Sequence, residues 1–252
     1  MEKRRVEELL KKKSSEGEKV IFILIDPEKI IGSDEELYEK AIRVVREGVD
    51  AFLVGGSLGV GGEDLDRTVL ILKKTGVPVI LFPGSVAGIS KYADAILFIS
   101  LLNSENPYYI IGAQVEGAII IKKLGLEAIP TAYIIIGDGG AAGYIGRARP
   151  IPHNMSYITL AYALAAEMLG MRFIYLETGS GSEKNVSPET ISLVRKNTNL
   201  YIITGGGIRD EKTACEILNS GSDAIVLGTI FEKDLNKTIS IIRAVKKNKC
   251  LL

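Results

Sequence analysis

The sequence has a single histidine, His153, two cysteines, Cys215 and Cys250, and no tryptophan. One histidine excludes zinc sites built on two or more histidines, and two cysteines are too few for a cysteine-rich zinc site. Any bound metal would therefore take oxygen ligands, which favours Mg²⁺. Two cysteines also argue for a reducing compartment and against a disulfide framework. We expect Cys215 to pack within a helix and Cys250 to lie in a frayed tail.

An excess of charge of one sign is also lacking, because 31 basic residues are balanced by 31 acidic ones. No nucleic-acid partner is predicted from such a balance. The chain has no apolar run of about 18 residues that could span a membrane. The charged start, Met1–Val6, is not followed by the apolar core of a signal peptide. These absences predict a cytoplasmic protein.

The chain does have regular alternation of apolar runs and amphipathic helical segments over its 252 residues. This length and pattern are typical of one (β/α)₈ TIM barrel, which we expect to fill residues 1–252 as a single domain. Short apolar runs ending in Gly, Pro or an acid are typical of buried parallel strands. The predicted strands are Val20–Ile25, Ala51–Val54, Pro78–Phe82, Ala95–Ile99, Ala128–Ile136, Arg172–Leu176, Leu200–Thr204 and Ala224–Leu227.

The connection between the third and fourth strands breaks this pattern. Only Ser85–Asp94 separates the two strands, which barely reaches the minimum for a parallel crossover. We therefore expect a modified barrel in which the helix between strands 3 and 4 is short or missing. A thin wall or groove would lie beside strands two to four; the alternative is a short helical turn without a function.

Glycine turns follow the last strands of the predicted barrel. Gly205–Gly207 ends the seventh strand, Gly228 and Thr229 end the eighth, and Thr178–Gly181 follows the sixth. Glycines let backbone N–H groups approach a ligand closely. Such turns at the end of a barrel are typical of a phosphate site, so we predict a phosphate cup at strands six to eight.

Two carboxylates, Asp26 and Glu177, stand at predicted strand ends. Asp26 is interpreted as a ligand for a hard metal, assisted by Ser57 from the adjacent strand, or else as a turn cap. Glu177 is interpreted as a general base or hydroxyl orienter, or else as the partner of a barrel cation. Tyr133 stands at another strand end. His153 is more typical of a capping or surface residue.

A phosphate cup at one side and a metal site at the other suggest two substrates, of which the second is a diphosphate. An alternative is a phosphate-binding barrel isomerase or lyase acting on a sugar phosphate. Such an enzyme needs a Lys or an acid–base pair on other strand ends, and none stands there. A barrel that only senses a phosphorylated metabolite is a further alternative, against which the metal candidate Asp26 argues.

Seven motifs together resemble the archaeal geranylgeranylglyceryl phosphate synthase family, from about Phe22 to Phe231. They are Phe-Ile-Leu-Ile-Asp-Pro-Glu-Lys, Val-Gly-Gly-Ser, Phe-Pro-Gly, Tyr-Ile-Ile-Ile-Gly-Asp-Gly, Tyr-Leu-Glu-Thr-Gly-Ser-Gly, Gly-Gly-Gly-Ile-Arg and Leu-Gly-Thr. The resemblance implies a Mg²⁺-dependent prenyltransferase on a barrel whose third helix is replaced. Such an enzyme joins the 3-hydroxyl of sn-glycerol 1-phosphate to geranylgeranyl diphosphate, forming an ether bond of archaeal lipids.

The resemblance also implies roles for individual residues. Asp26 and Ser57 would hold Mg²⁺, and Glu177 would orient or deprotonate the attacking hydroxyl. The substrate-binding residues would be Tyr133, Tyr175, Leu176, Glu177, Thr178, Gly179, Ser180, Gly181, Gly205, Gly206, Gly207, Gly228 and Thr229.

Two positions depart from the pattern of the family. Thr178 stands where many relatives have Ala, and Ile25 stands where bacterial relatives have Lys. Without that Lys, the phosphate charge would be met by main-chain amides, alone or with Arg209. We also expect a homo-oligomer, and peripheral contact with a membrane through the lipid product.

Overall fold

The eight predicted strands form one closed barrel in the computed structural model, which describes residues 5–30, 32–247 and 250. Every neighbouring pair is parallel, and β8 pairs with β1 to close the barrel. The expected TIM barrel is thus confirmed. The strands are β1 (Val20–Ile25), β2 (Ala51–Val54), β3 (Val79–Leu81), β4 (Ala95–Leu101), β5 (Glu127–Ile135), β6 (Phe173–Glu177), β7 (Tyr201–Gly205) and β8 (Ala224–Leu227).

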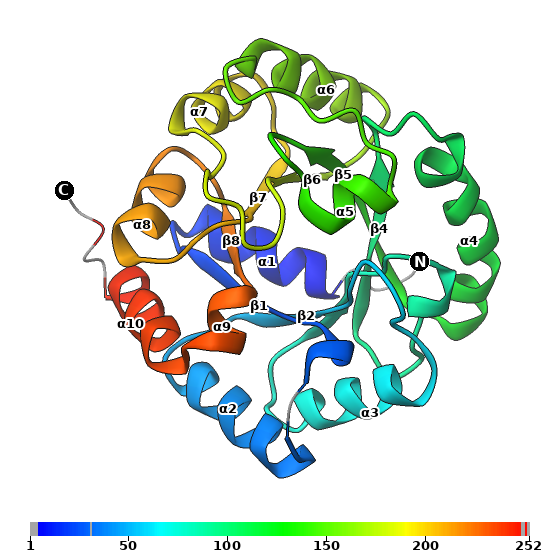
Figure 1. Ribbon diagram of the computed structural model, residues 1–252, viewed down its shortest axis with the longest axis vertical. Coiled ribbons are helices and arrows are strands. Elements are labelled where there is room, and N and C mark those ends of the chain that lie inside the picture. The colour runs from blue at the N-terminus through cyan, green and yellow to red at the C-terminus, as the bar shows by residue number, and fades with distance from the viewer. Residues whose placement is uncertain (1–4, 31, 248–249, 251–252) are drawn as a thin grey trace.

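Helices form a ring around the strands (Figure 1). The longer ones are α1 (Arg5–Ser15), α2 (Asp34–Arg46), α3 (Gly62–Lys73), α4 (Ala113–Leu124), α6 (Ser156–Met168), α7 (Pro188–Asn197), α8 (Glu211–Asn219) and α10 (Leu235–Lys246). The shorter ones are the 3₁₀ turns η1 (Pro27–Lys29) and η2 (Val86–Gly88), the π-helical turn η3 (Tyr108–Gly112), α5 (Gly140–Ile145) and α9 (Thr229–Lys233).

The core has two layers because successive side chains of a strand point to opposite faces. One layer fills the barrel and includes Phe22, Leu53 and Tyr175. The other lies between the barrel and the helices and includes Phe52 and Leu176. Strands buried on both faces need side chains that are apolar at almost every position, which explains the continuous apolar runs of the sequence.

Helix α1 closes the end of the barrel where the strands begin. Its Val6 and Leu10 belong to the interior cluster. Its first turn is held by Glu127, whose carboxylate accepts the backbone N–H groups of Val6 and Glu7, each at 2.8 Å. A carboxylate at a helix N-terminus satisfies unpaired N–H groups and complements the helix dipole. The open end of the barrel is therefore the opposite one, where the strands end.

The ring of helices is interrupted between β3 and β4. The three-residue turn η2 is the helical structure of that connection. The predicted absence of a full outer helix is confirmed. Helix α4 extends across to this region, because its Gly117 approaches Ile89 of the connection.

The expectation for the cysteines was wrong. Cys215 of α8 and Cys250 form a disulfide, with their Cα atoms 5.0 Å apart, and Cys250 is buried. The Cys250 carbonyl also accepts a hydrogen bond of 2.7 Å from the Asn219 side chain. The bond fastens the chain beyond α10 to α8, so Cys250 is not in a frayed tail, and cysteine usage does not argue for a reducing compartment. Sequence spacing could not reveal that α8 and this segment lie side by side.

No helix in the described ranges is both long enough and apolar enough to cross a membrane.

Candidate active site

Two cavities lined by described residues open at the carboxyl ends of the strands. The larger has a volume of about 410 Å³ and the smaller about 190 Å³. Both are lined by Leu24, Glu177, Ser180, Gly228 and Thr229. The cavities therefore adjoin, and Glu177 stands where they meet.

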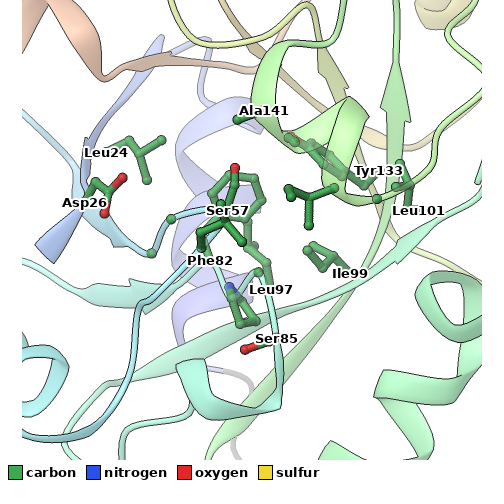
Figure 2. A pocket seen from close by; sticks show the side chains of 18 of the residues that line it. Leu24, Asp26, Ser57, Phe82, Ser85, Leu97, Ile99, Leu101, Tyr133 and Ala141 are labelled. Carbon is green, nitrogen blue, oxygen red and sulfur yellow. The ribbon is translucent and has the colours of Figure 1, made fainter. Parts of the chain in front are cut away.

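The larger cavity is a mainly apolar slot that runs toward the interrupted side of the barrel. Ile99, Leu101 and Tyr133 lie on one side of it, and Leu24 and Asp26 on the other (Figure 2). Helix α4 contributes Gly117 to the lining, and the connection after β3 contributes Pro83, Val86 and Ile89. The remaining lining includes Phe82, Leu97, Ala113 and Ile121. The missing outer helix thus leaves a long slot between β4 and α4.

Asp26 lies directly after β1 and faces this slot. One carboxylate oxygen accepts the backbone N–H of Glu28 at 3.2 Å, and the other forms an ion pair with Lys29 at 3.0 Å. The carboxylate also lies against Gly56, where an added Cβ would come within 2.6 Å of it. Asp26 therefore does cap a turn, as one interpretation held, and it still faces the cavity together with Ser57.

These oxygen donors fit a hard cation such as Mg²⁺. The described residues contain no group of three or more His, Cys, Asp or Glu that could enclose a metal by themselves. Mg²⁺ commonly binds through one or two carboxylates while substrate phosphates and water complete its coordination. A carboxylate and a hydroxyl beside an open cavity match that mode. They do not match an enclosed structural metal site, in which protein ligands surround the ion.

Glu177 is the last residue of β6 and is 6% exposed. Its Oε1 accepts the backbone N–H of Gly179 at 2.5 Å. Burial raises the pKa of the Glu177 carboxyl to about 7, although hydrogen bonds from Gly179, Tyr175 and Thr178 oppose this shift. Within the described ranges no Lys or Arg pairs with it, so the interpretation as the partner of a barrel cation was wrong.

Three aromatic rings form the wall beside Glu177. Phe82 stacks on Tyr175 with ring centroids 5.1 Å apart, and Tyr133 meets both rings edge-on at 5.5 and 5.3 Å. These rings exclude water from one side of the carboxyl group. Low polarity next to a carboxyl group favours its neutral form, which is the physical cause of the raised pKa.

Glycine turns line the smaller cavity. Gly206 has φ +93° and Gly207 has φ +66°, a region that residues with side chains rarely adopt. A Cβ on Gly206 would lie 2.2 Å from the Thr178 hydroxyl and 2.7 Å from Glu177 Oε1. Glycine is therefore required there for the two turns to approach each other. The backbone N–H groups of Gly206 and Gly207 have no acceptor among the described residues, so they are available to a ligand.

Three of the predicted substrate-binding residues are not among those that line either cavity. Leu176 packs in the layer between the barrel and the helices. Thr178 is fully buried, and its hydroxyl has no hydrogen-bond partner in the part of the chain that is described. Gly205 lies against the Tyr175 hydroxyl, where an added Cβ would approach to 2.2 Å. These three residues shape the site from behind.

Other lining residues were not found from the sequence. Ala141 and Ala142 of α5 cover the larger cavity, and Lys233 of α9 lines the smaller one. Helix α5 falls within the glycine-rich connection after β5, whose composition hides a short helix. His153 lies behind the same connection, against Gly137, and is not among the residues that line either cavity.

The PcrB family model matches residues 14–247 of this chain. The chain belongs to the PcrB family. Among its relatives, geranylgeranylglyceryl phosphate synthase of Staphylothermus marinus is 49% identical over 97% of this chain and 99% of the relative. The synthase of Saccharolobus solfataricus is 48% identical over 97% of this chain and 95% of the relative. The resemblance inferred from the motifs is confirmed.

A solved structure of a similar protein has the same fold. It is the crystal structure of (S)-3-O-geranylgeranylglyceryl phosphate synthase from Thermoplasma acidophilum in complex with sn-glycerol 1-phosphate. It is 36% identical, with a TM-score of 0.90, and the match covers 96% of this chain and 98% of that one.

Proposed function

We propose that this PcrB-family chain joins the 3-hydroxyl of sn-glycerol 1-phosphate to geranylgeranyl diphosphate and releases diphosphate. The observation that carries the proposal is the pair of adjoining cavities with Glu177 at their junction. One is long and mainly apolar, as a prenyl chain requires, and the other is small and lined by glycine turns, as a phosphate requires. The names of the relatives support the same assignment.

The acceptor would occupy the smaller cavity. Its phosphate would accept hydrogen bonds from the free backbone N–H groups of the glycine turns, and Lys233 would contribute positive charge. Glycerol phosphate is short, so its 3-hydroxyl would then lie within reach of Glu177. Held in this way, the hydroxyl faces the larger cavity, where the other substrate would lie.

The donor would occupy the larger cavity with its prenyl chain between β4 and α4 and its diphosphate beside Asp26. Asp26 and Ser57 would hold Mg²⁺, which when bound neutralises charge on the leaving diphosphate. Binding both substrates in a fixed orientation supplies a large part of the rate, because it converts an encounter of two molecules into a reaction within one complex.

Glu177 would act on the proton of the attacking hydroxyl. The oxygen of that hydroxyl forms a bond to C1 of the prenyl chain while the bond from C1 to the diphosphate oxygen breaks. The hydroxyl proton passes to the Glu177 carboxylate. The allylic carbon delocalises developing positive charge, so Glu177 acts late and mainly orients the hydroxyl. The wall of Phe82, Tyr133 and Tyr175 would keep water from competing as the acceptor.

Mass analysis of the product tests the proposal. The protein is incubated with Mg²⁺, sn-glycerol 1-phosphate and prenyl diphosphates of several lengths. We expect a prenylglyceryl phosphate whose formation requires both substrates, and the largest kcat/KM with geranylgeranyl diphosphate. Consumption of a sugar phosphate without any need for a prenyl donor would instead favour the isomerase or lyase alternative.

Narrowing the slot should shorten the accepted donor. Gly117 lines the slot, and an added Cβ would meet Ile89 at 3.5 Å and Ile121 at 3.8 Å, which are ordinary contacts. Gly117→Phe should therefore fold and fill part of the cavity. We expect the kcat/KM ratio of farnesyl to geranylgeranyl diphosphate to rise by about tenfold or more, because a filled pocket rejects the longer chain.

The control is Lys40→Phe, at an exposed position of α2 that lies outside the slot and outside the apolar surfaces of η3, α4 and α6. It adds the same side chain outside the slot and should leave the ratio near the wild-type value. An unchanged donor preference in Gly117→Phe would place the prenyl chain elsewhere.

We also propose that the chain forms a homo-oligomer through the outer surfaces of η3, α4 and α6. These surfaces expose large apolar side chains, which are Ile111, Val115, Ile119, Tyr157, Met168 and Leu169, each at least 59% exposed. An exposed apolar patch of this kind is typical of a protein interface.

Light scattering of the purified protein tests the oligomer. We expect a mass that is a multiple of 27.2 kDa for the wild type. Ile119→Asp should shift the mass to that of the monomer, because a charge would be buried in the interface. The control, Lys40→Asp on the exposed side of α2, should keep the wild-type mass. A monomeric wild type would contradict this proposal without affecting the proposed reaction.

A further inference from the structure

Two loops with glycine turns form the predicted phosphate cup, and each loop is held by a side chain of the other. The first loop follows β6 and spans residues 178–187, and the second follows β7 and spans residues 206–210. From the second loop, Arg209 Nη2 donates to the carbonyl oxygens of Gly181 at 2.7 Å and Ser182 at 2.9 Å. From the first loop, Asn185 Nδ2 donates to the carbonyl oxygen of Gly206 at 2.6 Å.

These bonds fix the orientation of the peptide groups that would face a phosphate. The C=O and N–H of one planar peptide group point in opposite directions. Asn185 holds the Gly206 carbonyl toward its own side chain, so the N–H of Gly207, in the same peptide group, points away from Asn185. Gly207 lines the smaller cavity. The side chain of Asn185 and the carbonyl of Ser182 also lie close to Gly207, where an added Cβ would approach them to 2.9 and 2.7 Å.

The loops need such support because glycine has the largest conformational freedom of any residue. Gly179, Gly181, Gly206 and Gly207 all have positive φ, and none has a side chain that could anchor its own loop. The contacts of Arg209 and Asn185 replace that anchoring. They join main chain to side chain across two loops that come from neighbouring strands.

The geometry also changes what Arg209 does. One guanidinium nitrogen, Nη2, donates to two main-chain carbonyls of the neighbouring loop. The nitrogen of a lysine at this position would end one bond closer to its own backbone and lacks the planar guanidinium group that orients Nη2. The residue was a candidate for meeting the phosphate charge directly. In the structure Arg209 lines the smaller cavity, and its hydrogen bonds go to the loop that carries the cup.

We infer, on the basis of the proposed function, that Arg209 and Asn185 are positioning residues that brace the two halves of the phosphate cup against each other. They hold the amides of the glycine turns toward the phosphate of the acceptor. The brace determines affinity for a phosphorylated acceptor, and it does not touch the prenyl donor or Glu177.

Steady-state kinetics of four single variants and one double variant test the brace. Arg209→Met removes the Nη2 donor, Arg209→Lys keeps the charge on a shorter side chain without the guanidinium group, and Asn185→Ala removes the reciprocal bond. Lys212→Met is the control, because it removes an exposed cation from α8 whose ion pair among the described residues is with Glu216 of the same helix. Melting temperature confirms folding, and calorimetry with sn-glycerol 1-phosphate and with inorganic phosphate measures binding directly.

We expect Arg209→Met and Arg209→Lys to raise the KM for glycerol phosphate to a similar extent, by about tenfold, as for loss of a hydrogen bond to a charged group. The KM for the donor should stay within twofold of wild type in these variants. In the control, Lys212→Met, the KM values for both substrates should stay within twofold of wild type. Asn185→Ala should raise the acceptor KM in the same direction. In the double variant, Asn185→Ala should raise the acceptor KM by a smaller factor than it does alone, because both side chains support the same pair of loops.

Two results would overturn the brace. The first is a near-normal KM for glycerol phosphate in Arg209→Lys together with a raised KM in Arg209→Met. That result would mean that only the charge matters and that Arg209 binds the phosphate directly. Near-normal acceptor KM in all variants would mean that the cup needs no support. Failure of the wild type to bind glycerol phosphate would refute the proposed function itself, and binding by wild type with unaltered variants would refute only the brace.

Discussion

Glu177→Gln should lower kcat by roughly a hundredfold to ten-thousandfold, as expected for loss of a general base. Gln keeps the size of the side chain and can still accept the N–H of Gly179, which now lies 2.5 Å from Oε1. The change therefore removes basicity while leaving the local structure in place. The KM for the prenyl donor and the melting temperature should be nearly unchanged.

The pH dependence of kcat provides a second measurement on the same pair of proteins. Burial raises the pKa of Glu177 from its ordinary value of 4.5 to about 7. The carboxylate is the form that accepts a proton, so wild-type kcat should rise with pH through about 7 and then level off. Glu177→Gln should lack this rise.

The same shift predicts an effect of pH on stability. A carboxyl group whose pKa is raised in the folded state favours that state when protonated. Stability contributed by Glu177 is therefore fully present below about pH 4.5 and is lost as the pH rises toward about 7. Glu177→Gln should lack this contribution, so the difference in unfolding free energy between wild type and variant should change over this window, which denaturant unfolding at several pH values would measure.

Glu127→Gln is the matched control for a buried glutamate with a structural role. Glu127 is 7% exposed and lies at the opposite end of the barrel, where it holds the first turn of α1. This variant should lose stability while the folded fraction keeps its kcat. If Glu177→Gln behaved in that way, with kcat near normal, Glu177 would be structural and its place in the reaction would have to be abandoned.

Asp26→Asn should lower kcat/KM by about tenfold to a thousandfold, the range for one lost electrostatic contact in an active site. Asn remains a good cap for the turn at η1, so the hydrogen bond to Glu28 N–H can persist. What is lost is the negative charge that would attract Mg²⁺. The Mg²⁺ concentration that gives half-maximal activity, and the affinity for the donor in the presence of Mg²⁺, should both weaken.

Lys29→Met serves as the control, because Asp26→Asn also breaks the ion pair between Asp26 and Lys29, which is 3.0 Å long. The ion pair is largely exposed on the Lys29 side and should contribute little. The control should keep the wild-type dependence on Mg²⁺. An unchanged Mg²⁺ dependence in Asp26→Asn would remove Asp26 from the metal site.

The sequence was sufficient to place the strands and therefore the end of the barrel that carries the site. Each apolar run ends in a residue that marks a turn, and in a parallel barrel all such ends lie at the same face. Asp26, Glu177 and the glycine turns could be brought together on that basis alone. The short connection Ser85–Asp94 likewise predicted the missing outer helix, because ten residues are too few for a full crossover helix.

Tertiary packing decided the rest, since it depends on contacts between segments that are distant in the chain. The raised pKa of Glu177 arises from how Phe82, Tyr133 and Tyr175 pack around its carboxyl group. The slot and its junction with the smaller cavity at Glu177 depend on how α4 packs across the gap left by the missing outer helix. The disulfide of Cys215 required that α8 and the segment after α10 lie side by side.

The sequence shows that Arg209 is a cation two residues after three glycines. Only the structure shows that its side chain donates to the carbonyl oxygens of Gly181 and Ser182. Local pattern thus determined the elements and the face they share, and the directions of individual side chains followed from the three-dimensional fold, because only there do distant loops become neighbours.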